Sequence, residues 1–102
     1  MPKGWFVGEF LPKTFGPRHS RNVEVKWGVH PKGEGKPPPG TSRGLTTLSL
    51  LISGCFTLTF TKECRSVTLE KPGDYVIFPH DSQHYWIANE DSVIVSIRWP
   101  QG

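Results

Sequence analysis

The stretch GDYVIFPHDSQHYWIAN, residues 73–89, decides the fold of this chain. It contains an apolar run at residues 75–78, a turn that begins at Pro79 and ends on His84, and a second apolar run at residues 85–88. Aromatic and β-branched residues bounded by turn residues are typical of strands. The stretch therefore predicts two strands joined by a proline-containing turn, with His84 at the start of the second strand.

Short strands separated by turn residues continue through the rest of the chain. The apolar and alternating segments that predict them are residues 5–11, 23–27, 45–52, 55–60, 67–69 and 92–99. Eleven Gly and ten Pro residues in a chain of 102 favour turns over long helices, and no segment indicates a helix convincingly. Eight or nine short strands predict an all-β sandwich or barrel, in which residues 45–52 are buried on both faces.

The length of 102 residues is enough for one domain with one core. We therefore expect residues 1–102 to form a single β-barrel domain. Within it, we expect an N-terminal arm at residues 1–22 and a Pro/Gly-rich loop at residues 31–44.

The charge and apolar patterns exclude two classes of partner. The net charge is +3, and the basic residues are scattered without a run of five, so no nucleic-acid surface is indicated. The longest apolar stretch, residues 45–60, contains Ser, Thr and Gly and predicts no membrane span, and we expect no signal peptide. Cys55 and Cys64 should lie far apart on one hairpin, so we expect two free thiols and a cytoplasmic protein.

The spacing within residues 73–89 resembles a family motif. Gly73, Pro79 and His84 match the second motif of the cupin family, G-x5-P-x-G-x2-H-x3-N. Asp81 replaces the second glycine of that motif, and Asn89 comes one place late. The resemblance implies a cupin-like double-stranded β-helix, that is, a jelly-roll β-barrel with a central cavity that is often found as a homodimer. It does not imply a particular activity, because one fold supports many functions.

The first cupin motif, G-x5-H-x-H-x3-4-E-x6-G, keeps only its frame in this chain. Gly35 and Gly54 occupy the two glycine positions, whereas Thr41, Arg43 and Thr47 occupy the three positions that bind metal in the family. A divalent transition metal takes at least three imidazole, thiolate or carboxylate ligands in a protein site. Hydroxyl groups are weak ligands, and a permanent cation repels the ion. The resemblance therefore implies a cupin-like domain without the usual metal.

His84 would hold a divalent transition metal only with other ligands. His30 and His80 are the histidines that could supply them, but their positions in space do not follow from the sequence. A metal at His84 stays open as an alternative to the metal-free site that we expect.

The candidate ligand-binding residues are His84, Trp86, Arg43, Thr47 and Thr41, and we name no catalytic residue. Strand alternation puts Trp86 on the same inner face as His84. The arginine would bind an anion, the histidine would form a hydrogen bond, and the tryptophan would form an aromatic wall. Alternatively, His84 and Trp86 pack in the core and Arg43 points to solvent. Arg98 either extends to solvent from an edge or pairs inward with a carboxylate.

The sequence favours a protein that binds a small organic ligand, with an anion favoured, in the barrel and without a metal. Two alternatives remain: a metal-dependent cupin enzyme of the isomerase or dioxygenase type, and a non-enzymatic interaction module. The module would act through a homodimer surface, for which the outward-facing Tyr85 and Ile87 are candidates.

Overall fold

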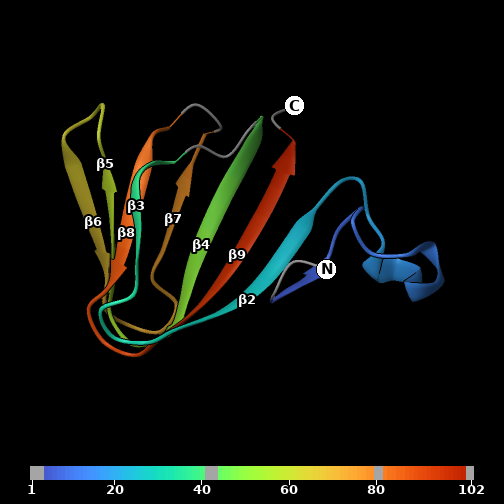
Figure 1. Cartoon of the computed structure of the whole chain (residues 1–102), viewed down its shortest axis with the longest axis horizontal. Coiled ribbons are helices and arrows are strands. Elements are labelled where there is room, and N and C mark those ends of the chain that lie inside the picture. Colours follow the sequence, from blue (N-terminus) through green and yellow to red (C-terminus); the bar gives the residue numbers. More distant parts are fainter. Residues whose placement is uncertain (1–3, 41–43, 80–81, 101–102) are drawn as a thin grey trace.

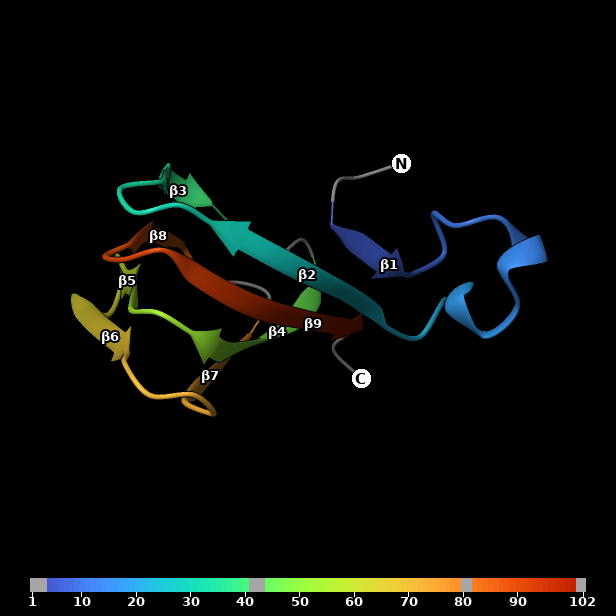
Figure 2. The same ribbon diagram turned by 90° about the horizontal axis from the view of Figure 1, so that it is seen from below.

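Two antiparallel sheets pack face to face in this protein (Figure 1). The structure, a computed structural model, describes residues 4–40, 44–79 and 82–100, with the backbone alone at residues 36–40. Nine strands and one 3-10 segment lie in these ranges. The end-on view separates the two layers, with β3, β8, β5 and β6 in one and β2, β9, β4 and β7 in the other (Figure 2).

The bounds of the elements follow from the sheet order. The five-stranded sheet contains, in spatial order, β1 (Trp5–Val7), β2 (Glu24–His30), β9 (Ser92–Pro100), β4 (Leu45–Ser53) and β7 (Tyr75–Phe78). The four-stranded sheet contains β3 (Gly35–Gly40), β8 (His84–Ala88), β5 (Phe56–Phe60) and β6 (Arg65–Leu69). The 3-10 segment η1 (Lys13–Arg18) precedes β2.

The path of the chain confirms the predicted jelly roll. From β2 to β5 and again from β6 to β9, each strand lies in the sheet opposite to the strand before it. Only the β1–β2 and β5–β6 pairs stay within one sheet. Such alternation closes two sheets around one interior, as in double-sheet jelly rolls.

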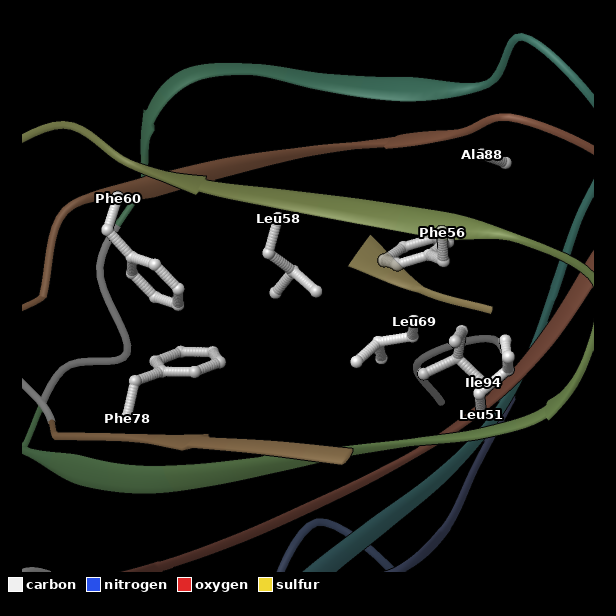
Figure 3. Close-up of a cluster of buried hydrophobic side chains, with 8 residues drawn as sticks. All are labelled: Leu51, Phe56, Leu58, Phe60, Leu69, Phe78, Ala88 and Ile94. Carbon is white, nitrogen blue, oxygen red and sulfur yellow. The ribbon is translucent and has the colours of Figure 1, made fainter. Parts of the chain in front are cut away.

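The hydrophobic core lies between the sheets. Phe56, Leu58 and Phe60 alternate inward along β5 and are each at most 7% exposed (Figure 3). Phe60 meets Phe78 of the opposite sheet edge-on, with ring centroids 5.3 Å apart. The other members of the cluster are Leu51, Leu69, Ala88 and Ile94. Burying each large apolar side chain contributes about 1.5–3 kcal/mol, so this cluster is the main source of stability.

Three predictions about local structure are wrong. The first strand ends at Val7 rather than at residue 11, because its partner β2 begins only at Glu24. Residues 45–52 are fully buried on one face only, because the four-stranded sheet covers only the inner side of β4. Within the predicted loop at residues 31–44, β3 pairs with β8. Its prolines are tolerated because β3 lies at the edge of its sheet, where missing N–H donors break no inner ladder. The segment before β2 contains η1. No helix in the described ranges is long and apolar enough to cross a membrane.

Gly54 follows β4 at a point where its backbone lies close to that of Asp91 and Ser92, and we call this close approach the crossing. Gly54 has a φ of +100°, and the pairing of β4 with β9 shifts register just before it. A Cβ atom at this position would lie 2.4 Å from the carbonyl oxygen of Asp91. Ser92 holds the crossing, because its Oγ accepts a hydrogen bond from the amide of Cys55 and donates its one hydrogen to the carbonyl oxygen of Glu90, 2.8 Å away. A side chain at Gly54 would therefore displace backbone.

Comparing Gly54→Ala with Gly73→Ala tests this crossing. Gly73 has nearly the same φ, +96°, but open space where its Cβ would be. We expect Gly73→Ala to cost about 1–2 kcal/mol of unfolding free energy through left-handed strain alone. Gly54→Ala should cost about 1–3 kcal/mol more, because it also overpacks the crossing. Urea denaturation measures both, and equal losses would contradict the described crossing.

Candidate functional site

The inner face of the five-stranded sheet changes from apolar to polar along its strands. Leu51 of β4 and Ile94 of β9 pair at the apolar end and join the core. Two further cross-strand rows carry polar side chains: Lys26, Ser96 and Ser49 in one, and Glu24, Arg98 and Thr47 in the next. The rows follow from the two-residue period of strands, which sends alternate residues of β2, β9 and β4 inward.

A cavity of about 130 Å³ lies above these rows. His84 and Trp86 of β8 line it from the opposite sheet, together with Phe56 and Leu58 of β5. The polar residues that line it from the five-stranded sheet are Lys26, His30, Thr47, Ser49, Ser96 and Arg98. The cavity therefore has a polar floor and a mainly aromatic roof.

An ion pair lies at the polar end of the cavity. Arg98 Nη2 is 2.8 Å from Glu24 Oε1, and the two side chains are 29% and 27% exposed. The contact is an ion pair and not an aligned hydrogen bond, and Arg98 Nε is buried without a hydrogen-bond partner. Of the two alternatives for Arg98, inward pairing with a carboxylate is therefore the correct one.

Trp5 of β1 covers this end of the cavity. Its ring centroid lies 4.0 Å from Arg98 Cζ and 5.7 Å from Lys26 Nζ. Both distances are within the range of cation–π attraction. The first strand thus contributes a wall of the cavity, although it is only three residues long.

His84 is buried and has a fixed orientation. Its ring packs 4.6 Å from the ring of Phe78, and its Nδ1 lies 3.1 Å from the carbonyl oxygen of Ser82. A carbonyl can only accept, so Nδ1 carries the hydrogen and donates it. In the neutral ring, Nε2 is then a hydrogen-bond acceptor. His84 is one of the residues that line the cavity.

His30 is a second histidine of the cavity wall, held by a carboxylate. Its Nδ1 lies 2.6 Å from Glu34 Oε1, and its ring meets Trp86 edge-on with centroids 4.6 Å apart. Gly28 makes room for the ring, because a Cβ there would lie 2.6 Å from His30 Nε2. A carboxylate that accepts from Nδ1–H leaves Nε2 able to accept a proton or a hydrogen bond.

The predicted site residues are brought together in part. His84, Trp86 and Thr47 line the same cavity. Thr41 and Arg43 lie outside the described residues. Reasoning from the motif missed Lys26, Ser49, Ser96 and Trp5. One signal could have found the serines: in LTTLSLLIS and SVIVSIRWP, polar residues interrupt apolar strands at alternate positions.

The described residues do not fit the metal that cupin folds often hold. Within residues 4–40, 44–79 and 82–100, no three His, Cys, Asp or Glu side chains form a group that could hold an ion. His80 lies outside these ranges. The cavity floor near His84 supplies hydroxyl groups and the cations of Lys26 and Arg98, which are poor surroundings for a transition metal.

Comparison with known proteins identifies the fold. No family model matches the chain, and no curated protein is similar to it in sequence. Solved structures do match. KdgF from a Halomonas species superimposes with a TM-score of 0.70 at 20% identity, over 81% of this chain and 73% of that protein.

Two further structures match equally broadly. A cupin superfamily protein from Desulfitobacterium hafniense has a TM-score of 0.68 at 20% identity, over 80% of this chain and 71% of its own. A conserved protein of unknown function from Streptococcus pyogenes has a TM-score of 0.69 at 14% identity, over 81% and 68%. The two sheets therefore have the jelly-roll fold of cupin proteins, as the sequence motif predicts.

A double-mutant cycle tests the ion pair at the end of the cavity. We expect Glu24→Gln to lower the unfolding free energy by about 1–2 kcal/mol, less than for a fully buried pair because both side chains are partly exposed. In an Arg98→Met background the same change should have a smaller effect, because the partner charge is gone. Urea denaturation of the four proteins gives the coupling energy, and additive losses would contradict the pairing.

Proposed function

We propose that the protein binds a short organic carboxylate in the cavity between the sheets, without a metal ion. The observation that carries this proposal is the polar floor, the rows that contain Ser49, Ser96, Thr47 and Arg98. Polar side chains in an interior contribute less to stability than apolar side chains of similar size. Apolar side chains at these positions would extend the core. The presence of polar side chains there instead favours a role in binding a polar ligand.

The charge of the lining favours an anion. Lys26 and Arg98 are the cationic residues among those that line the cavity, and no carboxylate is among the lining residues in the described ranges. Glu24 neutralises part of the Arg98 charge from one side. The buried Nε of Arg98 still has a hydrogen to donate, and a carboxylate is a strong acceptor for it.

The size of the cavity limits the ligand. A dry cavity of about 150 Å³ in another protein holds one benzene molecule, which has six heavy atoms. The present cavity of about 130 Å³ therefore suits a ligand of roughly six non-hydrogen atoms. Short hydroxy- and keto-carboxylates have this size, and their hydroxyl or carbonyl group would complement the serine hydroxyls of the floor.

The aromatic roof suits the carbon skeleton of such a ligand. Trp86 and Phe56 stack with ring centroids 5.0 Å apart and provide an apolar surface opposite the polar floor. A few polar groups opposite apolar walls are usual in small-molecule sites. The metal-dependent alternative lacks a comparable support, because the described residues group no suitable ligands.

The proposal predicts a ligand-dependent rise in melting temperature. We expect lactate or pyruvate to raise the Tm by several degrees at about ten times its Kd, since binding then adds roughly 1.4 kcal/mol. Lactamide, a neutral analogue of lactate, should raise it less at equal ionic strength. Arg98→Met and Ser49→Ala should reduce the rise, whereas Arg21→Met, which removes an exposed arginine, should not.

Each ligand effect is compared within one variant, so a change in the stability of the variant itself does not obscure it. A panel of carboxylates with two to six carbons that leaves the Tm unchanged would overturn the proposal. A rise that persists in Arg98→Met would place binding outside this cavity. Stoichiometric transition metal in the purified protein, measured by elemental analysis, would favour the metal-dependent enzyme instead.

A further inference from the structure

A histidine–carboxylate pair lies at the opposite end of the cavity from the ion pair of Glu24 and Arg98. His30 ends β2, two inner positions beyond Lys26, and its Nδ1 lies 2.6 Å from Glu34 Oε1. The His30 side chain is 11% exposed and the Glu34 side chain 43%. The binding of a carboxylate by the polar floor makes no use of this pair, so the pair is open to a further role.

The second ring nitrogen of His30 faces along the cavity floor. Strand alternation puts Lys26, Gly28 and His30 on the same inner face of β2. A Cβ atom on Gly28 would lie 2.6 Å from His30 Nε2, so the ring lies over Gly28, on the side of Lys26. Because Gly28 has no side chain, no residue of β2 separates Nε2 from Lys26. Both His30 and Lys26 line the cavity.

The ring of His30 is held in this orientation from several sides. Its centroid lies 4.6 Å from that of Trp86 and 5.5 Å from that of Phe56. The residue that holds Nδ1 is fixed in turn, because the backbone oxygen of Glu34 accepts a hydrogen bond from the amide of Ala88. A histidine that donates from Nδ1 to a carboxylate and accepts at Nε2 has the arrangement of a general base.

We propose that His30 acts as a general base on the ligand, and that the protein interconverts the keto and enol forms of a short 2-keto carboxylate. This inference rests on the proposed function, because the ligand must first be bound by the polar floor. Nε2 takes a proton from the carbon next to the carbonyl group. The electron pair of the broken C–H bond forms the carbon–carbon double bond of an enolate, and the negative charge moves to the carbonyl oxygen. The imidazolium then returns the proton, to the oxygen to give the enol or to the carbon to restore the keto form.

The spacing of the inner residues suits this proton transfer. Gly28 and Lys26 are about 7 Å apart along the strand, and reacting atoms must approach to about 3–3.5 Å. A ligand held at the row of Lys26 and Ser96 would therefore place a carbon within reach of His30 Nε2. The cations of Lys26 and Arg98 would stabilise the charge that develops on the oxygen, and the carboxylate beside Nδ1 would stabilise the imidazolium.

Deuterium exchange into pyruvate tests the reaction. In D2O each enolisation lets a methyl hydrogen be replaced by deuterium, so the methyl signal in the proton NMR spectrum should decay. We expect exchange at least about 100-fold faster with the protein than with an equal concentration of free imidazole. His30→Gln should lower kcat for exchange by about 100-fold or more, whereas the rise in Tm with pyruvate should persist.

Two sets of variants separate catalysis from structure. His19→Gln is the matched control, because His19 Nδ1 also lies 2.6 Å from an oxygen, that of Leu11, but His19 does not line the cavity. It should leave exchange unchanged. Glu34→Asp keeps the carboxylate and should retain more exchange than Glu34→Gln. Free imidazole should restore part of the exchange lost in His30→Ala, which a purely structural role of His30 would not allow.

The outcomes distinguish this inference from the proposed function. Pyruvate that raises the Tm without faster exchange would overturn the role of His30 and leave the proposed function standing. Pyruvate that neither raises the Tm nor exchanges would contradict both. Exchange that survives in His30→Gln, or that a chelator abolishes, would also overturn the inference, because the proton would then move through another group or a bound metal.

Discussion

The register of the five-stranded sheet is the constraint on which the rest of the structure depends. β9 lies between β2 and β4, and its pairing with both aligns Ser96 with Lys26 and Ser49 on one face. The same pairing aligns Val95 with its apolar neighbours on the other face. Because side chains alternate with a period of two, a slip of one residue would exchange the polar residues of the inner face with the apolar residues of the outer face. The packed end of the sandwich opposes such a slip, since Leu51 and Ile94 would then leave the core.

The interior is divided by this register into a part that stabilises and a part that is open to a ligand. At one end, Leu51 and Leu69 fill the space between the sheets. At the other end, the ion pair of Glu24 and Arg98 and the ring of Trp5 enclose a cavity without filling it. If the interior served stability alone, we would expect the apolar packing to extend into the space of the cavity. The polar groups lie where the sandwich is least packed. Substitutions in the site can therefore change what it binds without removing the core.

The fold could be predicted from the sequence because its signals are local. The spacing of Gly73, Pro79 and His84 and the alternation along β5 need no knowledge of partners, and both led to the jelly roll. The site was predictable only where the two motifs reach it, as with His84, Trp86 and Thr47. The positions of Lys26 and Arg98 depend on which strand lies beside β9, which the sequence does not reveal. β3 was not predicted because its three consecutive prolines indicate a loop. Prolines are tolerated in an edge strand, but the sequence does not show that this segment lies at an edge.

Three of the four tryptophans are distributed in a way that makes the protein its own spectroscopic probe. Trp5 and Trp86 line the cavity on opposite sheets, and Trp27 is 47% exposed on the outer face of the five-stranded sheet. The indole of Trp5 lies against a guanidinium group and that of Trp86 against an imidazole ring, so the emission of each should respond to local charge and polarity. Replacing the tryptophans one at a time by phenylalanine would separate an inner signal from an outer one. Events inside the barrel and events on its surface could then be followed separately by comparing these variants, without an attached dye.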